Sequence, residues 1–142
     1  MGRIVGFDVG ERRIGVAVSD VTATLARPVG TLSVKALDRA ALDAVAAQVA
    51  RLAAEDDSVA HVVVGLPKRL DGTPTDLTLR VERFARDLAA RTQLPVSLQD
   101  ERLSSREAEA RLAIREKDWR IRKQRLDAAA AAVILQDYLD SH

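Results

Sequence analysis

The spacing of hydrophobic residues changes after residue 34, and this change constrains the fold more than any other feature of the sequence. Ile4–Val9 and Ile14–Ser19 follow a period of two and flank the turn Gly10–Arg13, which predicts a β-hairpin. Leu25–Val34 predicts a third strand. Pro28 places that strand at a sheet edge, because proline cannot donate a hydrogen bond to a neighbouring strand. The chain is therefore expected to begin with three antiparallel strands.

From residue 38 onward, stretches with helical spacing alternate with short apolar runs. Apolar residues that recur every three or four positions indicate a helix, whereas a short continuous apolar run is typical of a strand covered on both faces. The expected elements are a helix from an Asp38 N-cap to Ala53, a strand over Val62–Leu66, a loop over Pro67–Asp76, a helix over Leu77–Leu88, a strand over Pro95–Gln99, a helix that begins at a capping box of Ser104 and Glu107, a charged break over Glu116–Arg125 and a final Ala-rich helix over Leu126–Tyr138.

This order of elements predicts an α/β fold. A hairpin meander followed by helix–strand crossovers implies a mixed five-stranded sheet, with three antiparallel strands and then parallel ones, and with helices on both faces. The 142 residues suit one domain over residues 1–142, and 47% hydrophobic residues allow a core to be buried.

The residue types that are absent or rare exclude several kinds of site. The sequence contains no cysteine, which excludes disulfides and cysteine-ligated zinc. The two histidines, His61 and His142, have no serine or aspartate partner at an evident spacing, so serine–histidine catalysis is not expected. The net charge of +1 indicates no particular partner. Without a signal-peptide pattern or a bilayer-length apolar run, we expect a soluble, cytoplasmic protein that does not contact membranes.

Three acidic sites interrupt otherwise apolar stretches. Asp8 stands within a strand, where an unpaired carboxylate is costly. It either accepts N–H groups of the Gly10–Arg13 turn or binds a metal or a phosphate-bearing ligand. Gln99–Arg102 either binds a ligand at the end of the last strand or forms a solvated loop. Asp127 either points inward with the apolar face of the last helix or is a first-turn residue favoured by the helix dipole.

One hypothesis covers all three sites. Two carboxylates on strands and one on the last helix can converge on a pair of divalent cations, because hard cations such as Mg²⁺ prefer oxygen ligands. Two such ions about 4 Å apart stabilise the attacking and leaving oxygens in phosphodiester hydrolysis. This chemistry needs neither histidine nor cysteine.

Four segments carry a resemblance to a known family: GFDVGERRIGVAVSD, VVVGLPKRLDGT, DERLSS and RLDAAAAAVILQDYLD. Between Arg3 and Asp140 they resemble, in order and spacing, the four blocks of the YqgF/RuvX family, which are RuvC-like proteins with the ribonuclease H fold. Its members are described as Holliday junction resolvases and as the nuclease that matures pre-16S ribosomal RNA. Arg12–Arg13 and Ser104 differ from the family's usual Lys-Arg and Thr but keep the type of chemistry.

The resemblance implies roles for individual acids. The family's catalytic, metal-binding residues fall on Asp8, Glu101 and Asp127, and the implied cofactor is Mg²⁺ or Mn²⁺, as two ions. Asp100 is adjacent to Glu101. Because successive strand residues point to opposite faces, we expect only one of these two to face the metals.

A basic segment precedes Asp127. Arg115–Arg125 holds six basic residues against two acidic ones. Such a segment would hold a phosphate backbone near the metals, and a solvated loop is the alternative. Within it, Trp119 either stacks on a base or fastens the loop to the core. Arg13 and Arg102 either contact phosphate or orient the carboxylates by ion pairing. The predicted nucleic-acid contacts are Arg13, Lys68, Arg69, Arg102, Arg120, Arg122, Lys123 and Arg125.

The sequence therefore favours a divalent-metal-dependent nuclease, and the family's description favours pre-16S ribosomal RNA as its substrate. A Holliday junction resolvase acting on four-way DNA is one alternative, and a non-catalytic RNA-binding ribosome-assembly factor is another. The first block also looks like the phosphate loop of the actin, sugar-kinase and chaperone superfamily, but those proteins need two copies of the domain. The sequence leaves open whether the protein is a monomer or a homodimer.

Overall fold

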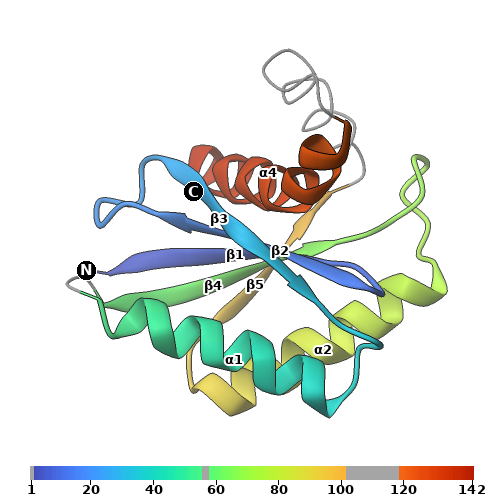
Figure 1. Cartoon of the computed structure of the whole chain (residues 1–142), viewed down its shortest axis with the longest axis horizontal. Coiled ribbons are helices and arrows are strands. Elements are labelled where there is room, and N and C mark those ends of the chain that lie inside the picture. The colour runs from blue at the N-terminus through green and yellow to red at the C-terminus, as the bar shows by residue number, and fades with distance from the viewer. Residues whose placement is uncertain (1, 56–57, 102–118) are drawn as a thin grey trace.

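A mixed five-stranded sheet lies at the centre of the computed structural model, which describes residues 2–55, 58–101 and 119–142, with side chains from residue 126 in the last range (Figure 1). The strand order is β3-β2-β1-β4-β5. β1 pairs antiparallel with β2 and β2 with β3, whereas β1 and β5 both pair parallel with β4. The predicted sheet is confirmed. Its strands are β1 Arg3–Val9, β2 Arg13–Ser19, β3 Ala26–Ser33, β4 Val59–Leu66 and β5 Val96–Asp100.

The start of β4 departs most from the sequence prediction, since the ends of the other strands lie within one residue of it. β4 begins at Val59 rather than Val62, because its parallel pairing with β1 extends back to Arg3. The polar His61 hid this extension from a search for continuous apolar runs. β3 is an edge strand, as Pro28 predicted, and its register with β2 shifts where Ala17 pairs with Pro28.

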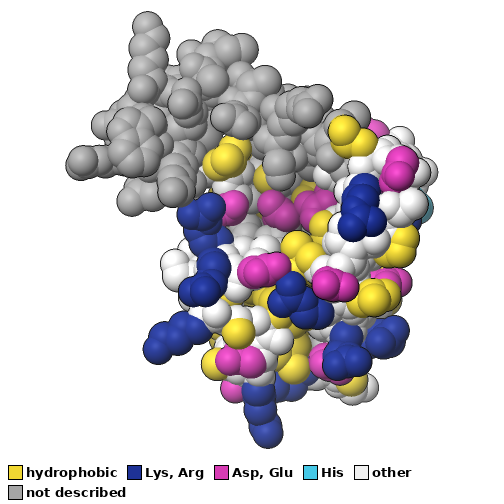
Figure 2. Space-filling model, turned by 90° about the vertical axis from the view of Figure 1, so that its right-hand side faces the viewer, with side chains coloured by type: hydrophobic (Ala, Val, Ile, Leu, Met, Phe, Trp, Pro, Cys, Tyr) yellow, Lys and Arg dark blue, Asp and Glu magenta, His cyan; other side chains and the backbone are white. Residues whose placement is uncertain are grey.

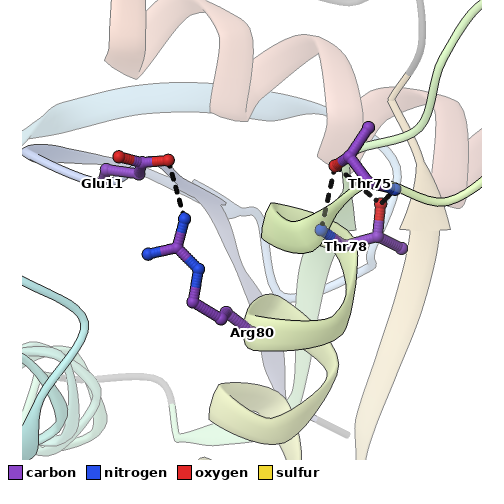
Figure 3. Close-up of polar contacts among 4 residues, drawn as sticks. All are labelled: Glu11, Thr75, Thr78 and Arg80. Carbon is purple, nitrogen blue, oxygen red and sulfur yellow. Dashed lines mark hydrogen bonds and ion pairs between the residues drawn. The ribbon is translucent and has the colours of Figure 1, made fainter.

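Helices cover both faces of the sheet, as predicted. α1 (Arg39–Ala53) and α2 (Asp76–Thr92) lie on one face, and α4 (Trp119–Ser141) lies across the other (Figure 1). Asp38 caps α1, because its Oδ1 accepts a hydrogen bond from the N–H of Ala41 at 3.0 Å. The capping box of Thr75 and Thr78 begins α2 and was not predicted (Figure 3).

The last helix corrects one prediction. A charged break was expected over Glu116–Arg125, but α4 begins at Trp119 and therefore includes residues 119–125. Arginine, lysine and glutamine are good helix formers, and no glycine or proline interrupts this stretch. Charge indicates exposure and does not by itself distinguish a loop from a helix. The helix predicted from Ser104 and Glu107 lies outside the described residues.

The two faces of the sheet bury separate hydrophobic clusters. The larger cluster joins Val5, Phe7 and Val9 of β1 to α1 and α2. The smaller one lies under α4 and joins Ala17 and Val63 to residues of that helix. In the described ranges, none of the helices has the length and hydropathy of a membrane span.

Candidate active site

Asp8 lies on the α4 face of β1. Strand residues alternate between faces, and Phe7 and Val9 are buried in the cluster under α1 and α2. Gly6 faces α4, since a Cβ built on it would lie 2.9 Å from Cβ of Leu135. Asp8, two residues further on, therefore points to the same side, near the end of its strand.

The turn after β1 does not account for this carboxylate. The N–H of Gly10 donates to the carbonyl of Arg13 at 2.9 Å, so this hydrogen bond lies within the turn. Among the described residues, the turn donates no hydrogen bond to the Asp8 side chain. The structural explanation considered for Asp8 from the sequence is therefore wrong.

Glu101 comes directly after β5 and continues its pairing. The N–H of Glu101 donates to the carbonyl of Leu66 in β4 at 3.3 Å. Its side chain lies against Gly65, where an added Cβ would stand 3.0 Å from Oε2. Asp100, one residue earlier, is exposed. Glu101 is thus the acid that turns inward at this end of the sheet.

Asp8 and Glu101 meet as a pair of carboxyl groups. Their side chains share a hydrogen bond, which requires one of them to carry a proton. Burial first, and then the charge of Asp8, raise the pKa of Glu101 to about 10. Burial also raises the pKa of Asp8, and Asp127 adds to this effect, while the hydrogen bond from Glu101 opposes it. Glu101 is therefore the donor of this hydrogen bond and Asp8 the acceptor.

Asp127 approaches this pair from α4. Because α4 begins at Trp119, Asp127 lies about two turns inside the helix. The first-turn explanation for this acid is therefore wrong, since the helix dipole acts within the first turn. Its Oδ2 stands 2.8 Å from Nε of Arg13, which confirms ion pairing for that arginine. The contact lacks hydrogen-bond alignment, so Oδ2 is a buried oxygen without a hydrogen-bond donor among the described residues.

Gly15 brings the two carboxylates from β1 and α4 together. It pairs with Asp8 across β1 and β2. A Cβ built on Gly15 would overlap the main-chain oxygen of Asp127, so only glycine lets α4 come this close to the sheet. Sequence reasoning missed Gly15 and Gly65. The available signal was a set of glycines inside apolar strands, which often marks a close backbone approach.

The predicted nucleic-acid contacts fall into three groups. Arg13 pairs with Asp127. Lys68 and Arg69 lie in the loop after β4, where Arg69 lines an open pocket beside the ion pair of Glu11 and Arg80 (Figure 3). Arg102 and the side chains of Arg120, Arg122, Lys123 and Arg125 lie outside the described residues, as does the side chain of Trp119. Nucleic-acid binding by all of these residues stays a prediction.

The end of the sheet where β1 and β4 finish carries both signs of charge. Figure 2 shows acidic side chains grouped in a row, with Lys and Arg side chains on either side of them. An acidic centre flanked by cations suits a polyanionic ligand that reaches the acids through bound metal.

The donor set fits a hard cation. In the described part of the chain, no three His, Cys, Asp or Glu side chains stand in an arrangement that could hold a metal ion. Two observations nevertheless match the carboxylates to such an ion. Asp8 and Glu101 are close enough to need a shared proton, which a cation can replace. The buried Oδ2 of Asp127 has a lone pair that no hydrogen-bond donor occupies.

Solved structures define the class of fold. A Holliday junction resolvase from fowlpox virus matches with a TM-score of 0.57 at 15% identity, covering 99% of each chain. RuvC of Thermus thermophilus, solved with a Holliday junction substrate, matches with a TM-score of 0.53 at 17% identity, covering 99% of this chain and 95% of RuvC. The fold is therefore that of the ribonuclease H-like resolvases.

The family is narrower than this class. Residues 2–141 match the model of RuvX, a family described as Holliday junction resolvase, and the chain belongs to that family. A "Putative pre-16S rRNA nuclease" of Chloroflexus aggregans is 46% identical over 139 residues, covering 97% of this chain and 93% of the relative. A protein of the same name from Dechloromonas aromatica is 41% identical over 141 residues, covering 99% and 92%. These matches favour the nuclease interpretation over an ATPase fragment.

Proposed function

We propose that this protein is a divalent-metal-dependent nuclease that hydrolyses phosphodiester bonds, with Asp8, Glu101 and Asp127 as its catalytic acids. The observation that carries the proposal is the carboxyl pair of Asp8 and Glu101. Two acids from separate strands share one proton at the end of the sheet, with a third acid beside them on α4. A purely structural site rarely places three carboxyl groups together, because each raises the cost of ionising the others.

Asp8, Glu101 and Asp127 would hold two divalent metal ions, either Mg²⁺ or Mn²⁺. A bound cation of this kind supplies Lewis-acid polarisation of a phosphoryl oxygen and lowers the pKa of water. The chain itself provides the charge and the proton balance. With a cation bound, the Glu101 carboxyl would release to solvent the proton that it donates to Asp8, so that both groups would be anionic ligands. The burial that opposes their ionisation also strengthens their hold on a cation, since charges interact more strongly in a poorly solvated site.

The relatives support pre-16S ribosomal RNA as the substrate. Two relatives that align with more than nine-tenths of this chain carry the name of a pre-16S rRNA nuclease. The phosphodiester is the same in RNA and DNA, so the acids by themselves do not choose between them. The preference for RNA therefore rests on these names.

Four-way DNA is the second candidate substrate. The family's own description is Holliday junction resolvase, and resolvase structures share the fold. In this alternative the same three acids cut a branched duplex.

One experiment tests the activity and the choice of substrate together. The purified protein is incubated with Mg²⁺ or Mn²⁺ and either RNA extended at the 5′ end of the small-subunit sequence or a four-way DNA junction. We expect cleavage of the RNA. Asp8→Asn should lower it by at least about 100-fold without loss of folding, which is the scale on which one charge-stabilising group acts. Asp100→Asn makes the same acid-to-amide change on the exposed side of β5 and should retain most of the activity.

The outcomes separate the alternatives. Cleavage of the junction alone would favour the resolvase. Binding of RNA without cleavage of either substrate, and with no difference between the two variants, would favour the non-catalytic assembly factor.

A further inference from the structure

We propose that Arg13 is a positioning residue for Asp127: its charge holds that carboxylate beside Asp8 while leaving Oδ2 open to a cation. This inference rests on the proposed function, because it assigns Asp127 to a cation site. It gives Arg13 a task that differs from phosphate binding.

β2 contacts Asp127 through two of its residues, Arg13 and Gly15. Arg13 and Gly15 are two positions apart, so they lie on the same face of the strand. Gly15 leaves room for the main chain of Asp127, since a side chain at this position would overlap the carbonyl oxygen of Asp127. Arg13 meets the side chain of Asp127 with Nε at 2.8 Å from Oδ2. One strand therefore sets both the backbone position and the side-chain direction of this acid.

The two partners differ in their access to water. The Arg13 side chain is 45% exposed and that of Asp127 is 19% exposed. Arg13 keeps much of its hydration and would remain charged without Asp127. The Asp127 side chain has little contact with water, and its charge raises the pKa of Asp8. Its Oδ2 has no aligned hydrogen-bond donor within the described residues. Asp127 therefore depends on Arg13 more than Arg13 depends on Asp127.

The alignment of the contact matters for ligand binding. An arginine that formed a fully aligned hydrogen bond would occupy the lone pair that a cation needs. Here the guanidinium is close enough to stabilise the charge, yet Oδ2 accepts no hydrogen bond from the described residues. The pair thus fixes the direction of the Asp127 carboxylate and leaves Oδ2 without a hydrogen bond from the described residues.

This arrangement predicts two effects of opposite sign when Arg13 is removed. The site loses a nearby positive charge, so a divalent cation should bind more tightly. Asp127 also loses the partner that directs its carboxylate, so turnover should fall, because misplacement of a reacting group by a small distance is costly. The charge effect should dominate cation binding, because contact with Gly15 still holds the main chain of Asp127 in place.

The test compares Arg13→Ala, Arg13→Lys and a matched control, Arg12→Ala. Arg12 is the neighbouring arginine, is exposed and forms no ion pair among the described residues. Without nucleic acid, the Mn²⁺ concentration that gives half of the increase in melting temperature reports cation binding. On the cleaved substrate, kcat and KM are measured separately.

We expect Arg13→Ala to lower the Mn²⁺ midpoint several-fold and kcat about 10-fold or more, with KM nearly unchanged. Arg13→Lys keeps the charge without the planar group, so it should restore the midpoint and only part of kcat. Arg12→Ala should change neither quantity. If Arg13→Ala does not fold, Arg13→Lys provides the test, because it should have the wild-type Mn²⁺ midpoint and a lower kcat.

Three results would overturn the proposal. A higher KM, a shallower dependence of affinity on salt and an unchanged Mn²⁺ midpoint would make Arg13 a phosphate contact. Equal behaviour of Arg13→Ala and Arg12→Ala would leave the ion pair without a role. A higher Mn²⁺ midpoint in Arg13→Ala would mean that Arg13 does not oppose cation binding.

Failure of the proposed function gives a different result. If the wild-type protein cleaves neither substrate but Arg13→Ala still lowers the Mn²⁺ midpoint, the nuclease assignment fails and the placement of Arg13 beside a cation site stands. If the wild-type protein cleaves but is not stabilised by Mn²⁺, the Arg13 proposal fails alone.

Discussion

On the side of the sheet covered by α1 and α2, β1 contributes Val5, Phe7 and Val9, and all three are fully buried. On the side covered by α4, the same strand contributes Gly6 and Asp8, and among the described residues the cluster there has five buried members, two of them alanines. The first face is closed by large side chains. The second is closed by fewer large side chains and by close approach of α4 at glycines, to its backbone at Gly15 and to its side chains at Gly6 and Gly65.

The α1 and α2 side of the sheet therefore provides most of the stability, and the α4 side holds the acidic groups. Burial of large apolar side chains stabilises a fold roughly in proportion to the area removed from water. Buried carboxyl groups that face one another do the opposite, unless a proton or a cation lies between them. Substitutions on the α1 and α2 side of β1 should therefore cost more stability than substitutions on its α4 side.

The largest effect is expected from Phe7→Ala. Phe7 is fully buried against α1 and α2, so its loss should lower the free energy of unfolding by about 3–5 kcal/mol, measured by denaturant titration. Ile4→Ala is the matched change on the α4 face and should cost less, because Ile4 is only partly buried. Equal losses would contradict the expectation that the face under α1 and α2 stabilises the fold more than the face under α4.

A smaller loss is expected from Gly15→Ala. One added methyl group would overlap the carbonyl oxygen of Asp127, so α4 must shift. Overpacking of this kind costs about 1–3 kcal/mol, and we also expect loss of cleavage, because Asp127 moves with the helix. Gly30→Ala in β3 is the control, since an added Cβ there meets nothing within 4 Å. A Gly15→Ala protein with normal melting and normal cleavage would show that the close approach is not needed.

A third effect concerns pH. The pKa of Glu101 is raised from 4.5 to about 10, mainly by burial, so between these values the folded protein keeps a proton that the unfolded chain releases. The free energy of unfolding should therefore fall as pH rises through this range. Glu101→Gln cannot ionise, so its melting temperature should fall less between pH 5 and pH 9 when chelator removes metal.

The same proton predicts how cation binding depends on pH. Because a bound cation displaces it, the stabilisation by Mn²⁺ should grow with pH in the wild-type protein. Comparing the wild-type protein with Glu101→Gln cancels the contributions of the other titrating groups. Parallel melting curves for the two proteins over the whole pH range would contradict the shared proton.

Local patterns were sufficient for most of the architecture. The period of two in the first strands, the edge position signalled by Pro28 and the cap at Asp38 depend on neighbours in the chain, and all were confirmed. The start of α4 was wrong, because a charged helix and a charged loop have similar compositions. The capping box of Thr75 and Thr78 was missed, because threonine at its third position departs from the usual glutamate or glutamine.

By itself, the sequence determined the order of the strands and helices, the family and the three acids that deserve testing, since these follow from periodicity and from motifs read along the chain. Only the tertiary structure decided that Glu101 shares a proton with Asp8, that Arg13 pairs with Asp127 and that Gly15 admits α4. The physical reason is distance along the chain. Burial and charge act through space, so the ionisation and direction of each carboxyl group depend on residues from strands and a helix that meet only after folding.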